Sequence, residues 1–150
     1  MAVTRDEQQL IADGFEPVYV ELEWYDGPQK GLAVISGAPH YFEARDHHLA
    51  DDADEYVVWP ASEAAVAMER EQWAIFARWN ERYEAGLVEP DSHPGNGGID
   101  ARYDELASLL APYRRVPDGA RRLRGEVRFD AGTRYRVDGV DYWFRWRTHR

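Results

Sequence analysis

Alternating apolar and polar positions predict two groups of strands, one toward each end of the chain. At residues 18–25, valine, leucine and tryptophan alternate with tyrosine and glutamate, a pattern typical of a half-buried strand. The expected strands are at 18–25, 32–36, 40–45, 56–59 and 122–129. Farther on, Asp138-Gly139 favours a two-residue turn, which predicts a C-terminal hairpin.

Large aromatic residues at helical spacing predict a long helix over residues 62–85, between the two groups of strands. Ser62 suits its N-cap, and Gly86 suits its end. A shorter helix is expected after Asp100. Residues 87–98 contain two Pro and three Gly, so we expect a flexible loop there.

The order of strands, helices and strands predicts one domain over residues 1–150, of the α+β class. The expected architecture is an antiparallel sheet, made of an N-terminal meander and C-terminal hairpins. The long aromatic helix and the shorter helices are expected to pack on one face of that sheet. A chain of 150 residues, 44% of them hydrophobic, can bury a substantial core.

Charge and composition exclude several classes of function. The formal net charge is −10, which argues against simple wrapping of nucleic acid. The chain has no cysteine, which excludes disulfides, zinc thiolate sites and thiol catalysis. The longest run without a charged residue is 12 residues, too short to cross a bilayer. The N-terminus has no apolar signal core, so a cytoplasmic location is expected.

Specialised catalytic motifs are not expected either. None of the serines stands in a Gly-x-Ser-x-Gly elbow. The glycine-rich segment 94–98 has no strand before it and no lysine after it, unlike a phosphate-binding loop. Histidines and aspartates gather at residues 40–54, but their spacing does not fit a metal site, and the expected interpretation is a solvated acidic loop. We therefore expect no metal and no cofactor.

The basic residues gather in the last third of the chain, where the predicted hairpin would align them. Residues 101–150 carry a net charge of +5 against −15 for residues 1–100. With Asp138-Gly139 as the turn, Tyr142, Phe144 and Trp146 face the core. The opposite face collects the candidate binding residues, which are Arg128, Arg134, Arg136, an exposed Trp143, Arg145 and Arg147.

Like charges on one sheet face need an anion to compensate them. Three sources are open: the chain's own acidic half, another protein, or an anionic small molecule. The expected function is a non-enzymatic binding or interaction module that uses this Arg/Trp face. The sequence indicates no oligomeric state.

The alternative is a small acid–base enzyme built on the first strands. Its candidate residues are Glu21, Glu23, His40 and Glu43, which are types that donate and accept protons in catalysis. A binding module should leave the arginine face open. An enzyme should instead hold Glu21, His40 or Glu43 in a closed cleft.

Overall fold

The computed structural model describes residues 5–24, 28–46, 53–129 and 142–148. The strands are β1 (Glu16–Trp24), β2 (Pro28–Ile35), β3 (Ala38–Asp46), β4 (Ala53–Pro60), β5 (Arg121–Phe129) and β6 (Tyr142–Thr148). The helices in these ranges are α1 (Arg5–Ala12), α2 (Glu63–Glu84) and α3 (Ala101–Leu110), and two short 3-10 turns between α2 and α3 are η1 (Pro90–Ser92) and η2 (Pro94–Asn96).

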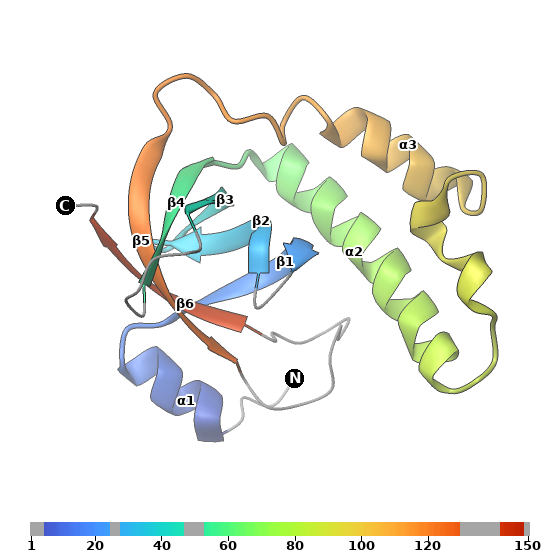
Figure 1. The fold of residues 1–150 in the computed structure, drawn as a ribbon, viewed down its shortest axis with the longest axis horizontal. Coiled ribbons are helices and arrows are strands. Elements are labelled where there is room, and N and C mark those ends of the chain that lie inside the picture. The colour runs from blue at the N-terminus through green and yellow to red at the C-terminus, as the bar shows by residue number, and fades with distance from the viewer. Residues whose placement is uncertain (1–4, 25–27, 47–52, 130–141, 149–150) are drawn as a thin grey trace.

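The six strands form a closed antiparallel barrel in chain order, shown in Figure 1. The ring closes where β6 pairs with β1, with Val18 opposite Tyr142 and Glu16 opposite Phe144. The predicted open sheet with helices packed on one face is therefore wrong. Alternation along a strand does not distinguish the two architectures, because both bury one face of every strand.

Irregularities in β1 help to bend the sheet. The pairing of β1 with β2 shifts register between Val18 and Val20, and again between Glu21 and Glu23. Such bulges increase strand twist and turn side chains to a different face. A Cβ on Gly31, opposite the bulge, would lie 2.1 Å from the Val20 carbonyl oxygen, so only glycine fits there.

Aromatic rings fill the interior of the barrel. The rings of Phe42, Tyr56, Phe144 and Trp146 contact one another at centroid distances from 4.4 to 6.0 Å. On β5, a Cβ at Gly125 would approach the Phe144 ring to 2.8 Å, so this glycine gives the ring its room. The barrel interior is therefore a packed core, and a ligand site has to be sought outside it.

The helical insertion, residues 61–120, connects β4 to β5, and α3 lies alongside α2 within it (Figure 1). The Ser62 hydroxyl accepts a hydrogen bond from the Ala65 amide at 3.1 Å. The Asp100 carboxylate accepts one from the Tyr103 amide at 2.8 Å. Both predicted helices and both predicted N-caps are thereby confirmed.

A second apolar cluster joins α2 to the outer wall of the barrel. Its buried members are Val20, Leu32, Tyr41, Val57, Trp59 and Ala65. The predicted aromatic stripe of α2 is buried only in part, since Phe76 is 7% exposed and Tyr83 is 38% exposed. Polar residues share the buried face of α2, namely Glu69, Gln72 and Asn80.

Residues 87–98 fold against α2. The Trp79 indole donates a hydrogen bond to Ser92 Oγ at 2.8 Å, and the His93 ring lies 4.6 Å from the Trp79 ring. These contacts hold the loop on the helix, and its predicted flexibility stays a prediction. The predicted Asp138-Gly139 turn lies outside the described residues.

Candidate functional site

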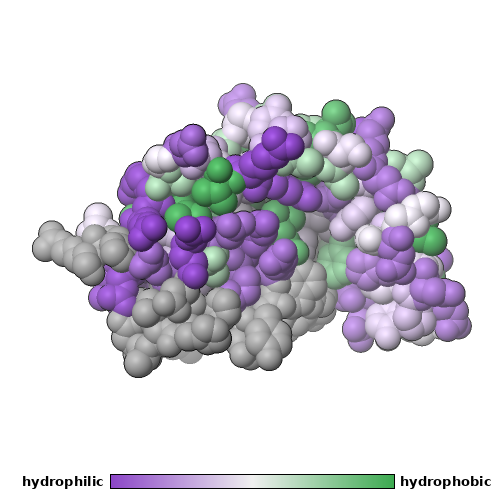
Figure 2. Space-filling model, turned by 45° about the horizontal axis from the view of Figure 1, so that its top comes forward, coloured by the Kyte–Doolittle hydropathy of each residue, from purple (hydrophilic) through white to green (hydrophobic). Residues whose placement is uncertain are grey.

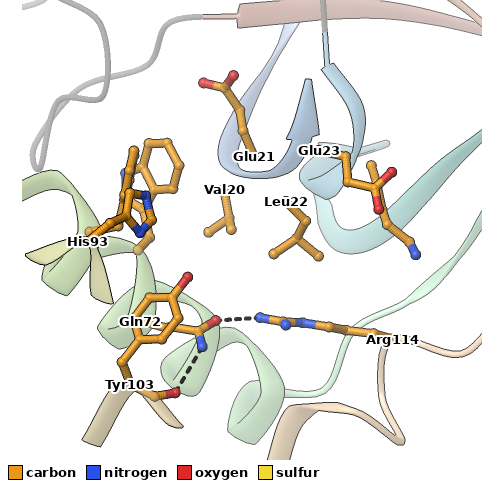
Figure 3. Close-up of a pocket in the computed structure, with 11 residues that line it drawn as sticks. Val20, Glu21, Leu22, Glu23, Gln72, His93, Tyr103 and Arg114 are labelled. Atoms are coloured by element: carbon orange, nitrogen blue, oxygen red, sulfur yellow. Dashed lines mark hydrogen bonds between the residues drawn. The ribbon is translucent and has the colours of Figure 1, made fainter. Parts of the chain in front are cut away.

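A pocket of about 320 Å³ lies between β1 and the helical insertion (Figure 3). Val20 and Leu22 of β1 form one wall. Trp73 and Phe76 of α2, together with His93, form the aromatic wall opposite. Ligand pockets commonly measure about 300–1,000 Å³, so this one suits a small molecule.

A buried ion pair underlies one side of the pocket. Glu69 is fully buried, and it accepts two hydrogen bonds from Arg114, from Nε at 2.9 Å and from Nη2 at 2.6 Å. Arg114 Nη2 also donates to Gln72 Oε1 at 2.6 Å, and Gln72 Nε2 donates to the Tyr103 carbonyl at 3.1 Å. Arg114, Gln72 and Tyr103 all line the pocket, so this network presents fixed polar groups to it.

The network extends into the barrel wall through Tyr41. The Tyr41 hydroxyl donates to Glu69 at 2.7 Å. Burial and this bond raise the pKa of Tyr41 well above its ordinary value, so the phenol stays protonated. Burial opposes the charge of Arg114, but the bonds and charge of Glu69 outweigh it and raise the pKa of Arg114. The guanidinium therefore keeps its charge beside the pocket.

His93 lines the pocket, and its hydrogen bond to Gly95 fixes which of its ring nitrogens is a donor. Its Nδ1 accepts a hydrogen bond from the Gly95 amide at 2.8 Å, and burial lowers the pKa of His93. An accepting Nδ1 carries no proton, so in the neutral ring the proton is on Nε2, which is then a donor. The ring packs 5.3 Å from Phe76, which adds it to the aromatic wall.

The sequence-predicted acid–base residues are divided by the fold. Glu21 is 5% exposed and, like Glu23, lines the pocket. Figure 3 shows Glu21 turned away from Gln72 and Arg114, on the opposite side of β1 from Val20. The pairing of β1 with β2 shifts register between Glu21 and Glu23, and Glu23 is exposed whereas Glu21 is buried.

The other two acid–base candidates lie outside the pocket. Glu43 forms an ion pair with Lys30 of the pocket rim at 2.9 Å. His40 lies near the turn between β2 and β3, where its Nδ1 donates to the Ala38 carbonyl at 2.9 Å. The structure thus brings Glu21 and Glu23 to the pocket but leaves Glu43 behind its rim and His40 elsewhere.

The arginine face has an internal anion. Glu126 is 5% exposed and lies within 2.7 Å of both Arg128 and Arg145 and 3.6 Å of Arg147. The hydrogen bond from Arg145, followed by the charges of Arg128 and Arg147, lowers the pKa of Glu126. We call these four residues the Glu126 cluster.

Trp143 differs from its prediction. It pairs with Arg128 across β5 and β6, as a residue on the arginine face should. However, it is 4% exposed, so the expected exposed tryptophan is wrong. Alternation predicted the face of Trp143, but it gave no information on what covers that face. Arg134 and Arg136 lie outside the described residues.

Sequence reasoning missed the polar residues beneath the pocket. Glu69, Gln72 and Phe76 follow one another at helical spacing on the buried face of α2. A glutamate in such a stripe is ordinarily placed at the surface, because isolated carboxylates are costly to bury. The sequence did hold one signal for these residues. Glu69 and Gln72 follow Ala65 at helical spacing and precede Phe76 at the same spacing, so all four lie on one face of α2.

Comparisons with protein-family models, curated proteins and solved structures found no match to this chain. Among the described residues, no group of three or more His, Asp or Glu could hold a metal ion. None of the helices in those ranges has the length and apolar character of a membrane span.

Proposed function

We propose that this protein binds a small molecule in the pocket between β1 and the helical insertion. One observation carries the proposal: the Glu69–Arg114–Gln72 network is held beside a concave, partly aromatic pocket. A buried ion pair is weak evidence for stability, because well-packed apolar residues often serve as well. Charged groups fixed beside a cavity instead favour a binding role.

The face of the molecule shown in Figure 2 favours the same proposal. On the face shown in Figure 2, hydrophobic residues lie in small patches among hydrophilic ones. Large apolar patches are typical of stable protein interfaces. A recessed pocket that combines aromatic side chains with fixed polar groups is instead typical of small-molecule sites.

The test is a fragment screen followed by amide and indole NMR. Small polar ring compounds should shift the Trp73 indole and Gly95 amide signals, because Trp73 lines the pocket and the Gly95 amide donates to His93, which also lines it. Leu22→Phe should fill the pocket and abolish these shifts. Leu109→Phe is the matched control, since Leu109 lies on α3 and is 49% exposed. If no compound moves the two signals, or if Leu22→Phe leaves them unchanged, the proposal is wrong.

The Glu126 cluster supports a second proposal, an interaction surface for an acidic partner. Three arginines share one carboxylate, and their side chains are 43–60% exposed. The cluster therefore keeps an excess of positive charge, as the sequence-based binding hypothesis requires. Attraction between exposed charges is screened by salt.

Poly-glutamate is a suitable probe for this surface. Arg147→Ala should weaken its binding at low salt without loss of stability, because Arg147 is 60% exposed. Arg145→Ala should also lower stability, since it removes a direct partner of the buried Glu126. Arg115→Ala, exposed and outside the cluster, is the control. Equal binding by all four proteins, the wild type included, would contradict this proposal.

A further inference from the structure

The inner side of the pocket is rich in hydrogen-bond donors. His93 offers Nε2–H because its Nδ1 accepts from Gly95. Arg114 uses Nε and Nη2 in its bonds to Glu69 and Gln72, and these bonds do not use Nη1. Tyr103 adds a phenol, whose pKa is raised by burial, so its proton is kept.

Of the acceptors that line the pocket, the carboxylate of Glu23 is exposed to solvent, and those nearer the inner side are engaged or directed elsewhere. The Gln72 amide oxygen accepts from Arg114, and its nitrogen donates to the Tyr103 carbonyl. Figure 3 shows the Glu21 carboxylate on the far side of β1 from Gln72 and Arg114. A ligand group placed here therefore meets donors, and an acceptor group suits it best.

Two cations, Arg114 and Lys30, line the pocket together with the carboxylates Glu21 and Glu23 of β1. Glu69 is fully buried, whereas Arg114 lines the pocket, so the cationic end of this pair faces the cavity. Lys30 stands at the rim, with Glu43 as its partner on the neighbouring strand. Trp73 and Phe76, whose rings lie 5.5 Å apart with their planes inclined at 50°, provide an apolar aromatic surface beside these donors.

We propose that the ligand is a small ring-bearing carboxylic acid, with its carboxylate toward Arg114 and its ring against Trp73 and Phe76. This inference rests on the proposed small-molecule function, and it names the chemistry of that ligand. A guanidinium held in place by a buried carboxylate binds a second carboxylate without first being ordered, which favours affinity. The pocket volume of about 320 Å³ limits the ligand to a small size.

Three probes of similar size separate the ligand classes: benzoate, benzyl alcohol and benzylamine. Each is titrated into the full-length protein, with the Trp73 indole and Gly95 amide NMR signals as the readout. Benzoate should bind at least about tenfold more tightly than the other two, because a charge-assisted hydrogen bond contributes about 1.5–3 kcal/mol.

Two variants locate the charge that the carboxylate meets. Lys30→Met should weaken benzoate binding by about two- to fivefold, as expected for a partly exposed charge, and leave benzyl alcohol unaffected. Arg122→Met is the matched control, because Arg122 is an ion-paired cation of β5 that does not line the pocket. Arg114→Lys keeps the charge beside Glu69 but loses the guanidinium fork, so benzoate should bind more weakly.

The outcomes separate this inference from the proposed function. If benzyl alcohol or benzylamine binds as tightly as benzoate, the pocket is a ligand site but the carboxylate assignment is wrong. Equal loss of benzoate binding in Lys30→Met and Arg122→Met would also overturn it. If none of the probes moves the pocket signals while other compounds of the screen do, the inference fails and the proposed function stands.

Discussion

Glu69 has the most unusual environment of any residue at this site. Its carboxylate is fully buried and accepts hydrogen bonds from Tyr41 and from two nitrogens of Arg114. A buried carboxylate without such partners would be strongly destabilising. With them, Glu69 fixes the position of Arg114 at the pocket and connects α2 to β3. The same three contacts thus serve the fold and the candidate site.

Replacing only Arg114 of the Glu69–Arg114 ion pair should lower the free energy of unfolding more than replacing both residues. Arg114→Met should lower the free energy of unfolding by about 3–5 kcal/mol, because it leaves Glu69 charged and buried. Adding Glu69→Gln should recover part of that loss, since the new amide is neutral and still accepts from Tyr41. Urea denaturation of the two single variants and the double variant measures the coupling. Additive losses would show that the pair is not coupled.

At the scale of elements, β1 is central because it belongs to both the barrel and the pocket. Its register shifts place Val18 in the barrel interior, whereas Val20 packs toward α2. This change of face lets one strand serve two apolar clusters. Simple alternation over 18–25 predicted the strand correctly but could not predict the shifts, because a bulge depends on the partner strand.

The β1 bulge makes Gly31 indispensable. Gly31→Ala should destabilise the protein by about 1–3 kcal/mol or more, the usual range for overpacking, because its Cβ would meet the Val20 carbonyl oxygen at 2.1 Å. Gly37→Ala is the control, with open space around its Cβ and only a positive φ of 79° to strain it. Thermal unfolding compares the two variants. A smaller loss for Gly31→Ala than for Gly37→Ala would contradict the prediction.

The η2 turn should be sensitive to acid through His93. The pKa of His93 is lowered from 6.5 by burial, so the unfolded chain takes up this proton first as the pH falls. The stability that neutral His93 gives to the folded protein is therefore complete above about pH 6.5. It is lost as the pH falls through the lower pKa of the folded state. Protonation at Nδ1 would also remove the acceptor for the Gly95 amide.

The variant His93→Asn isolates this effect, because asparagine offers an acceptor to Gly95 but does not titrate. Urea denaturation at about pH 8 and about pH 5.5 should show a smaller loss of stability on acidification in His93→Asn than in the wild type. His40→Asn, which changes a half-buried histidine away from the pocket, should behave like the wild type. Identical pH dependence in all three proteins would exclude His93 as the cause.

At the scale of the whole molecule, local patterns predicted the elements but not their closure. Ser62 and Asp100 mark their helices by side-chain chemistry close in sequence, so both were predictable. The β1–β6 pairing joins residues from nearly opposite ends of the sequence. Nothing in the sequence around Val18 indicates that it pairs with Tyr142. The pocket was unpredictable for the same reason, because β1, α2 and Arg114 meet only after the barrel closes.

The barrel and the helical insertion should unfold together. The barrel and the insertion share an extensive contact. The rings of Tyr41 and Trp59 of the barrel stack with their centroids 5.5 Å apart, within the apolar cluster that α2 covers. Trp59 also donates to the Tyr113 carbonyl of the insertion at 3.1 Å. Loss of the helices would expose this apolar wall, so neither part has a stable state alone. Urea unfolding followed by helical circular dichroism and by tryptophan fluorescence should give one coincident transition.

Two further variants sharpen this test. Trp79→Phe removes a fluorophore of the insertion, and Trp146→Phe removes one from the barrel. In each variant, the remaining fluorescence and the circular dichroism should still change at the same urea concentration, even where the midpoint itself moves. A barrel signal that persists after the helical signal is lost would show two independent folding units. The pocket would then open by release of the insertion while the barrel stays folded, because its walls come from both parts.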